Sequence, residues 1–287
     1  MEKWPNFFIV GAPRAGTTSL YEYFKQTKGV FMSPIKDPDF FAVETDLDFA
    51  VLKQIKDKKE YLKLFENVKN EIAVGEASPT YLHDPKAPKL IHDTIPNAKI
   101  IISLRDPVER AYSYFLNLVN SGTTSESFSD CIRNGIDSSS GYASQVIGGG
   151  FYYEQVKTYL EIFGRNQVKI IIFEEFVKNT REGLLEIYNF LGIKSEPPEN
   201  SEKIFNPTRK PRGKILEKVI KNQALRKIAK ETLPRSSTST LKTIFGKKTE
   251  KEPISNQDKK LLEDLYRDDV KNLERLLGRT LPWELAK

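Results

Sequence analysis

The chain has 287 residues and a mass of 32.9 kDa, with 39% hydrophobic residues and a single cysteine, Cys131. This hydrophobic content is enough for a core, which excludes a wholly disordered chain, and the length suits one large α/β domain. One cysteine cannot form a disulfide within the chain, and no apolar run approaches the roughly 20 residues of a membrane-spanning helix. Because the N-terminus also lacks a secretory-signal pattern, we expect a cytoplasmic protein.

The formal net charge of +6 is spread unevenly along the chain. Residues 203–251 contain 15 lysines and arginines against 3 acidic residues, a local charge of +12, so the other residues together carry −6. A basic segment on an otherwise acidic protein favours an anionic partner: a nucleotide-like cofactor, an acidic substrate, a lipid surface or a nucleic acid. A solvated helix with lysines on its outer face explains the same pattern equally well.

Short runs of Ile, Val and Phe alternate along the chain with amphipathic helical patterns. We predict buried strands at Asn6–Val10, Ile72–Gly75, Lys99–Leu104 and Val168–Phe173. We predict helices at Thr17–Gln26, Lys58–Val68, Ala87–Thr94, Val108–Asn120, Phe151–Phe163 and Arg181–Leu191. Near-continuous β-branched residues are typical of a parallel sheet covered on both faces. The alternation therefore predicts a three-layer α/β/α fold with a central, mainly parallel sheet, whose ligands bind at the carboxyl ends of the strands.

The strand pattern stops after the last of these helices. A basic amphipathic helix is predicted at Lys214–Glu231, and a final helix at Ser255–Leu277. We expect Trp283 to pack the C-terminal tail back onto the body of the protein. We interpret residues 1–287 as a single domain, with 192–254 as a basic, partly mobile insertion or lid region.

A glycine-containing loop, Gly11–Thr18 (GAPRAGTT), joins the first predicted strand to the first predicted helix. Glycines permit a tight turn there, and the free N–H groups at a helix start can hold an anion, so this context predicts a phosphate site. The alternative is an ordinary strand–helix turn capped by a threonine. The spacing Gly11 to Gly16 fits the Walker P-loop, but Thr17 replaces its lysine and the cation is Arg14. This replacement makes ATP or GTP hydrolysis an unfavourable interpretation.

A second candidate anion site follows the strand that ends at Leu104. Asp106, Pro107 and Glu109 have a structural explanation, because they resemble a helix capping box. Arg105 has none, and it stands where the ligand crevice of an α/β sheet lies, able to offer two parallel hydrogen bonds to phosphate. Ser113 lies two turns into the helix, either as a ligand or as a buried serine bonded to its own backbone.

Together these residues resemble the sulfotransferase family that uses 3′-phosphoadenosine-5′-phosphosulfate (PAPS). The resemblance implies that the 5′-phosphosulfate is bound by Arg14, Ala15, Gly16, Thr17 and Thr18. It implies that Arg105 and Ser113 bind the 3′-phosphate, since the segment from Arg105 to Ser113 matches the family's R-[DNE]-P-x-x-R-A-x-S. Further similar segments are Gly75–Tyr81, Gly150–Tyr152 and Leu276–Trp283. The resemblance implies a sulfotransferase fold like that of P-loop nucleoside-triphosphate hydrolases, with 3′,5′-ADP as the product.

Charge and chemistry agree with this resemblance. PAPS carries about −4, counting about −2 for its 3′-phosphate, and thus needs two anion sites. Sulfuryl transfer passes through a dispersed-charge, in-line transition state that positioning and electrostatic donors can stabilise. We expect no required metal, and the sequence shows no His, Cys and carboxylate cluster with ligand spacing.

The resemblance also suggests catalytic roles. Arg14 would stabilise the charge that grows on the leaving phosphate, because arginine cannot act as a proton donor. The segment Lys36–Phe41 (KDPDFF) is similar to a Lys-Glu-Pro-x-Phe-Phe segment of bacterial members, which places Asp37 at the catalytic glutamate, one methylene shorter. An exposed Asp-Pro turn is the alternative. His83 and Glu76 are further candidates for the base.

The family usually has a basic loop that closes over the 3′-phosphate and adenine, and 206–214 falls at that place. This loose alignment suggests cofactor contacts for Arg209, Lys210, Arg212 and Gly213. Tyr152, in the Gly-x-Tyr motif, is as well explained by the core as by the cofactor.

The predicted reaction moves a sulfuryl group from PAPS to a hydroxyl or amine of a small-molecule, glycan or lipid-linked acceptor, with a carbohydrate-like acceptor favoured. Two alternatives remain: an atypical P-loop kinase, and a non-catalytic protein that binds nucleotides or polyanions. Nucleic acid is disfavoured, because 203–251 contains only Phe205 and Phe245 as aromatic residues for stacking. A helix at 214–231 could also contact an anionic membrane peripherally.

Overall fold

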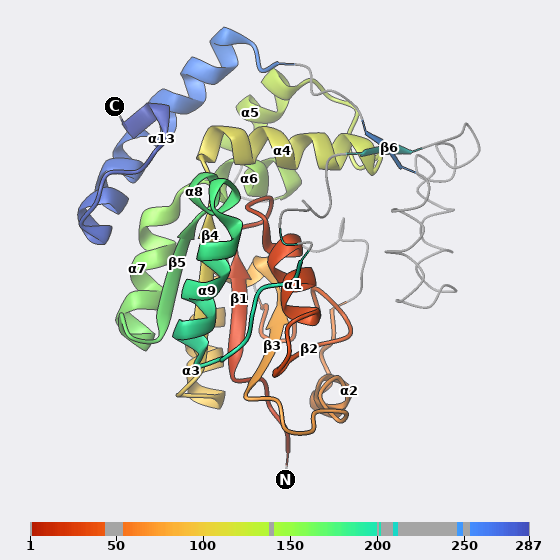
Figure 1. Ribbon diagram of the computed structural model, residues 1–287. Helices are drawn as coiled ribbons and strands as arrows, with labels where there is room; N and C mark the ends of the chain where they lie inside the picture. The colour runs from red at the N-terminus through yellow and green to blue at the C-terminus, as the bar shows by residue number, and fades with distance from the viewer. Residues whose placement is uncertain are drawn as a thin grey trace.

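The computed structural model describes residues 2–43, 54–137, 141–199, 201, 209–211, 246–248 and 253–286. Its centre is a five-stranded sheet in the order β2-β3-β1-β4-β5, with every neighbouring pair parallel (Figure 1). The strands are β1 (Phe7–Gly11), β2 (Val30–Met32), β3 (Ala73–Ala77), β4 (Lys99–Leu104) and β5 (Val168–Ile172). The predicted parallel α/β/α fold is confirmed.

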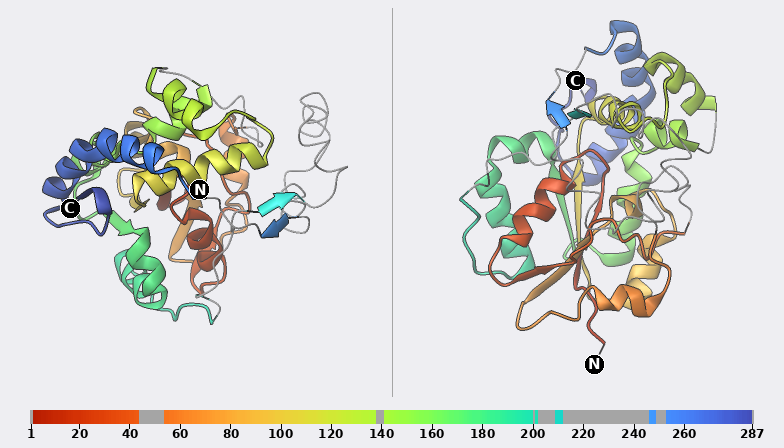
Figure 2. Two further views of the ribbon diagram at one scale, coloured as in Figure 1. Left: turned by 90° about the horizontal axis from the view of Figure 1, so that it is seen from above. Right: turned by 90° about the vertical axis from the view of Figure 1, so that its right-hand side faces the viewer.

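Helices cover both faces of this sheet, and further helices lie across its carboxyl edge (Figure 2). The helices that share a core with Phe7 and Ile9 are α1 (Thr17–Lys25), α8 (Phe173–Lys178) and α9 (Thr180–Leu191). The opposite face carries α2 (Lys58–Lys63), α3 (Ala87–Thr94) and α7 (Tyr152–Phe163). At the carboxyl edge lie α4 (Pro107–Asn120), α5 (Phe128–Asp137), α6 (Gly141–Gly148) and α13 (Asn256–Leu277).

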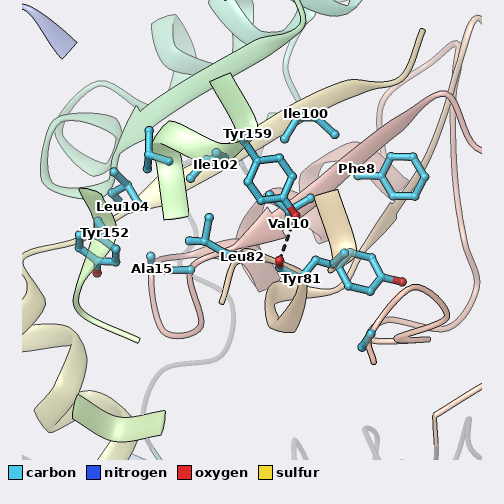
Figure 3. Close-up of a cluster of buried hydrophobic side chains, with 14 of the residues drawn as sticks. Phe8, Val10, Ala15, Tyr81, Leu82, Ile100, Ile102, Leu104, Tyr152 and Tyr159 are labelled. Atoms are coloured by element: carbon cyan, nitrogen blue, oxygen red, sulfur yellow. Dashed lines mark hydrogen bonds between the residues drawn. The ribbon is translucent and has the colours of Figure 1, made fainter. Parts of the chain in front are cut away.

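Strand β1 shows how the sequence divides the core into two layers. Phe7 and Ile9 contribute to one buried cluster, while Phe8 and Val10 contribute to the other, because successive side chains of a strand point to opposite faces. In the larger cluster, the Tyr159 hydroxyl donates to the Tyr81 carbonyl oxygen at 3.0 Å (Figure 3). This bond ties α7 to the short helix η1 (Pro79–Leu82), which lies directly after β3.

Several elements differ from the predictions. Strand β2 was not predicted, because three residues show no hydrophobic pattern, and α5, α6 and α8 were also missed. The second predicted helix ends at Lys63 instead of Val68. Trp283 packs as expected, with 1% of its surface exposed. The final 3-10 helix is η2 (Glu284–Ala286).

Most of the basic segment lies outside the described residues. Its described parts are the paired strands β6 (Arg209–Pro211) and β7 (Gly246–Lys248), which run antiparallel. The predicted helix 214–231 is not described, so the single-domain interpretation of 1–287, with 192–254 as a lid, stays a prediction. Among the helices that the structure does describe, none combines the length and apolar character needed to cross a bilayer.

The close approach of β1 and β3 generates a stability prediction. Gly75 pairs with Phe7, and a Cβ at Gly75 would overlap the Phe7 ring, which is fully buried. We expect Gly75→Ala to lower the free energy of unfolding by about 2 kcal/mol in denaturant titrations, as overpacking of a core does. Gly148→Ala is the matched control, because the nearest atom to its added Cβ is Ser144 Oγ at 4.0 Å. Equal stabilities of the two variants would contradict this account of the β1–β3 contact.

Candidate active site

The loop between β1 and α1 is fixed to the end of the neighbouring strand β4 by one serine. The Ala12 N–H donates to the Ser103 carbonyl oxygen at 2.6 Å, and Ser103 Oγ donates to the Ala15 carbonyl oxygen at 2.6 Å. Main chain and side chain of Ser103 therefore hold both halves of the loop. The loop cannot shift without moving β4.

Helix α1 begins with its N–H groups toward this loop. Gly16 is the N-cap, with a left-handed φ of 83°, and a Cβ there would lie 2.8 Å from the Phe173 ring. Only glycine meets both requirements without strain. The first bond within the helix runs from the Leu20 N–H to the Gly16 carbonyl oxygen, so the helix does not use the N–H groups of Thr17 and Thr18. These groups are suited to bind an anion.

Two arginines from separate strand ends meet beside this helix start. Arg14 Nε donates to Ser113 Oγ at 3.2 Å, and Arg105 donates from a terminal guanidinium nitrogen to the Arg14 carbonyl oxygen at 3.3 Å. Arg14 adopts a left-handed φ of 72°, so the chain turns sharply at this residue. The structure thus brings Arg14, Arg105 and Ser113 together, as the sequence motifs suggested.

The charge of this cluster is positive. Burial, together with the nearby charge of Arg105, lowers the pKa of Arg14 to about 10, so Arg14 stays protonated at neutral pH. No carboxylate forms an ion pair with Arg14 within the described part of the chain. Arg105 pairs with the half-exposed Glu109 at 3.1 Å, an i,i+4 contact that contributes little. Two buried or half-buried guanidinium groups with so little compensation are suited to bind an anion.

Arg105 is also positioned by its neighbours. Its guanidinium lies 5.2 Å from the centre of the Phe173 ring, and the Tyr152 hydroxyl donates to the Arg105 carbonyl oxygen at 2.9 Å. Tyr152 itself is fully buried, so it belongs to the core and touches the site through the Arg105 backbone. The structure therefore places Tyr152 in the core, and a contact between Tyr152 and the cofactor stays a prediction.

A cavity of about 410 Å³ opens beside the loop. Residues from α1, α8 and the start of α9 line it together with Gly16 and Ser103. Phe173 stands at its wall, and Lys178 and Arg181 contribute positive charge. Sequence reasoning missed Phe173, although its place at the carboxyl end of a predicted strand is a signal that could have found it.

Asp37 lies in a turn that crosses the carboxyl end of β3. Its N–H donates to the Ala77 carbonyl oxygen at 2.9 Å, and the Asp39 N–H donates to Ser78 Oγ at 3.1 Å. Asp37 and Asp39 both have left-handed φ values, 60° and 54°. The Asp37 side chain is 38% exposed and forms an ion pair with Lys36 at 2.5 Å. The carboxylate therefore stands, accessible, at the sheet edge that carries the loop.

Asp39, in contrast, is buried. Thr80 Oγ1 donates to its carboxylate at 2.5 Å, and Gln54 Nε2 donates to its carbonyl oxygen at 2.8 Å. Burial, reinforced by the negative charge of Asp37, raises the pKa of Asp39 to about 6. Sequence reasoning gave Asp39 no role, because its burial follows from the fold of the turn and not from a pattern.

The charges of loop and turn act on one buried hydroxyl, that of Tyr114 in α4. Burial raises the pKa of Tyr114 to about 12, and the charges of Arg110 and Arg14 oppose this rise. The negative charges of Asp39 and Asp37 add to it. Positive charge from Arg14 and Arg110 and negative charge from Asp37 and Asp39 thus have opposite effects on the pKa of Tyr114.

The two other candidate bases are enclosed. The ring nitrogens of His83 are buried and have no hydrogen-bond partner within the described ranges, and burial beside Arg110 lowers the pKa of His83 to about 4. Glu76 is fully buried, its two carboxylate oxygens have no hydrogen-bond partner among the described residues, and burial raises its pKa well above the usual value. Both differ from Asp37 in lacking an exposed polar atom.

Of the predicted basic loop 206–214, only Arg209–Pro211 lies among the described residues. Strand β6, with Arg209 and Lys210, contacts α4 beside the C-terminal end of that helix, while Arg105 precedes its N-terminal end (Figure 1). A helix of 14 residues is about 21 Å long. The cofactor contacts suggested for Arg209 and Lys210 stay predictions, and those for Arg212 and Gly213 fall outside the described residues. Among the residues that are described, no group of three or more His, Cys, Asp or Glu could hold a metal ion.

Comparison with known proteins decides the family. The sulfotransferase domain model matches residues 5–273. The chain belongs to the sulfotransferase family. This confirms the resemblance drawn from the two anion-site motifs.

Curated relatives of this sulfotransferase domain act on carbohydrates by name. Human carbohydrate sulfotransferase 15 is 26% identical over 251 residues, which span 66% of this chain and 44% of the relative. The bifunctional heparan sulfate N-deacetylase/N-sulfotransferase 1 of Caenorhabditis briggsae is 26% identical over 216 residues, 71% of this chain and 24% of the relative. The chain thus spans less than half the length of these relatives.

Solved structures show the same fold. A sulfotransferase from Alicyclobacillus acidocaldarius superposes with a TM-score of 0.73 at 29% identity, covering 97% of this chain and 98% of that one. Mouse sulfotransferase SULT7A1, complexed with PAP, superposes with a TM-score of 0.55 at 16% identity, covering 96% and 87%. At this lower identity the second likeness shows the fold alone.

The burial of Asp39 generates a prediction for the sulfotransferase domain. Its folded-state pKa of about 6 lies above the usual 3.8, so the folded protein binds the extra proton more tightly. The stability that this proton contributes is complete below about pH 4 and is lost as the pH rises through 6, about 3 kcal/mol in all. We expect Asp39→Asn, which keeps an acceptor for Thr80 and tolerates a left-handed φ, to abolish this loss in denaturant titrations from pH 4 to 7.

Asp93→Asn is the control, because Asp93 forms an exposed pair with Lys89 in α3. It should keep the pH dependence of the wild-type protein. If Asp39→Asn shows the wild-type slope between pH 4 and 6, the carboxyl of Asp39 ionises normally in the folded protein.

Proposed function

We propose that this protein transfers the sulfuryl group of PAPS to a hydroxyl or amine of a carbohydrate-like acceptor. The observation that carries the proposal is the contact between Arg14 and Arg105, which come from separate strand ends and meet beside the start of α1. Holding the positive charges of Arg14 and Arg105 close together costs free energy, because they repel each other. A ligand with two anionic groups would offset this repulsion.

The residues present fit PAPS. Two guanidinium groups and a helix N-terminus, together about +2.5, would offset more than half of its charge of about −4. Thr17, Thr18 and the backbone N–H groups of the loop would hold the phosphosulfate, and Arg105 with Ser113 would hold the 3′-phosphate. The cavity of about 410 Å³ beside Gly16 and Phe173 would accept the adenosine. The PAP bound to the mouse relative supports this donor, because PAP is 3′,5′-ADP, the product left by PAPS.

PAPS supplies a sulfuryl group already attached to a phosphate leaving group. Arg14 stabilises negative charge on that phosphate without giving up its own proton, since its pKa stays near 10. Ser113 links the two anion sites, because its hydroxyl accepts from Arg14 and it stands on the helix that Arg105 precedes. Occupation of one site thereby orients the cation of the other.

Asp37 is the base in this proposal. It is the exposed carboxylate of the turn at the carboxyl edge, and it would take the proton from the acceptor as the new S–O or S–N bond forms. His83 and Glu76 are unsuited, because their polar atoms are buried and an acceptor could not reach them. The pair with Lys36 uses one oxygen of the Asp37 carboxylate, and the side chain is 38% exposed.

The curated relatives indicate the chemical class of the acceptor but not the individual molecule. Relatives named for carbohydrate and heparan sulfate sulfotransfer favour a sugar hydroxyl or amine. The lipid-linked acceptor and the peripheral membrane contact through 214–231 stay predictions, because that segment is not described.

Ligand-dependent melting tests the donor. With 3′,5′-ADP at 100 times its Kd, we expect about 2.7 kcal/mol of added stability, seen as a raised melting temperature. Mg-ATP at the same concentration should give little or no shift, because the loop lacks the Walker lysine. A shift with Mg-ATP alone would favour the P-loop kinase alternative. Binding of 3′,5′-ADP without any sulfuryl transfer would favour the non-catalytic alternative.

Asp37→Asn tests the base. The amide keeps the shape of the side chain and tolerates the left-handed φ, but it cannot accept the proton. We expect kcat to fall by about 10²–10⁴, the usual contribution of a positioned base, while the Kd for 3′,5′-ADP changes less than twofold. Asp93→Asn on the exposed face of α3 should retain full activity. Wild-type turnover in Asp37→Asn would remove Asp37 from the mechanism.

A further inference from the structure

One peptide group connects Arg105 to Asp106 at the point where the chain leaves β4 and enters α4. Its carbonyl oxygen accepts from the Tyr152 hydroxyl at 2.9 Å. Its N–H donates to Glu174 Oε1 at 3.0 Å. Because a peptide group is planar, a hydrogen bond at each polar end fixes the orientation of the whole plane. That plane sets the direction in which the Arg105 side chain departs.

Glu174 is itself held by the C-terminal tail. Its second oxygen, Oε2, accepts from Trp283 Nε1 at 3.0 Å, and Trp283 is 1% exposed. The tail is fixed in turn by Arg279, which pairs with Glu175, and by Leu281, whose N–H donates to a carboxylate oxygen of Glu274. The carboxylate of Glu174 thus bridges the tail and the start of α4.

The other support of the peptide group leads to the same part of the chain. Asp269 of α13 accepts from the Tyr152 N–H at 2.7 Å, which fixes the start of α7. The rings of Tyr152 and Trp283 lie 6.0 Å apart. Tyr152 and Glu174, the two hydrogen-bond partners of the Arg105–Asp106 peptide, are therefore both held by α13 or by the tail that follows it.

We propose that Glu174 is a positioning residue for Arg105, and that Trp283 in the C-terminal tail positions Glu174 in turn. Glu174 touches no part of the proposed ligand site and acts through the backbone N–H of Asp106. The role rests on the proposed function, in which Arg105 binds the 3′-phosphate. Phe173, next to Glu174, lies against the Arg105 guanidinium. Two consecutive residues after β5 therefore contact the Arg105 side chain and the peptide group that follows it.

Glu174→Gln tests this positioning role with a side chain of the same shape. A glutamine has one acceptor oxygen, so its NH₂ group must face either the Asp106 N–H or the Trp283 N–H, two donors. Glu186→Gln is the matched control, because Glu186 of α9 forms an exposed pair with Lys169 and takes no part in holding the tail. Trp283→Phe keeps a ring in the tail but removes the indole donor.

The measurement compares affinity for 3′,5′-ADP with that for 5′-AMP by calorimetry, since the two differ in the 3′-phosphate. We expect Glu174→Gln to lower the preference for 3′,5′-ADP at least fivefold and to change the Kd for 5′-AMP less than twofold. Trp283→Phe should act in the same direction more weakly, and Glu186→Gln should match the wild type. An unchanged preference, or an equal loss for both nucleotides with a lower melting temperature, would overturn the positioning role.

A second readout needs no ligand. The chain has two tryptophans, so its NMR spectrum holds two indole N–H signals, and Trp283→Phe assigns them. Glu174→Gln should shift the Trp283 signal and leave that of Trp4. An unmoved Trp283 signal would overturn the Glu174–Trp283 contact. A wild-type protein that binds no 3′,5′-ADP would overturn the proposed donor together with the role of Glu174, whereas wild-type binding with an unchanged preference overturns the role of Glu174 alone.

Discussion

The structure depends on holding two positively charged arginines in one place at the edge of a parallel sheet. Arg14 and Arg105 belong to loops that 91 residues of chain separate, and their charges repel each other in the absence of a bound anion. Backbone anchors resist this repulsion: Ser103 holds the loop of Arg14, while Tyr152 and Glu174 hold the peptide group after Arg105. The site is rigid because its anchors are bonds to the main chain.

Negative charge stands in a turn across the same edge of the sheet, on Asp37 and Asp39. Asp37 stays accessible and paired with Lys36, while Asp39 is buried and bonded to Thr80. Two carboxylates only two residues apart thus have different environments, which separates a group that can exchange protons from one that holds the turn. Left-handed φ values at both positions produce this alternation.

The sequence predicted the parts of this molecule that local patterns determine. Strands β1, β3, β4 and β5 coincide with short, mainly apolar runs, so the sheet could be predicted. Arg14, Arg105 and Ser113 stand in motifs with fixed spacing, which indicated that these three residues lie together. Strand β2 has three residues, and α8 follows β5 without a break, so neither leaves a periodic pattern. Phe173, Asp39 and Glu174 act through contacts between distant elements. No spacing in a single sequence reports such contacts.

Ser103 has a consequence for both arginines of the site. It fixes the loop of Arg14 through its own backbone and side chain, and Arg105 follows two residues later, directly after the strand. About 7 Å of extended chain therefore connects the anchor of one arginine to the backbone of the other. The two arginines thus share one structural support, so a change at Ser103 affects the positions of both.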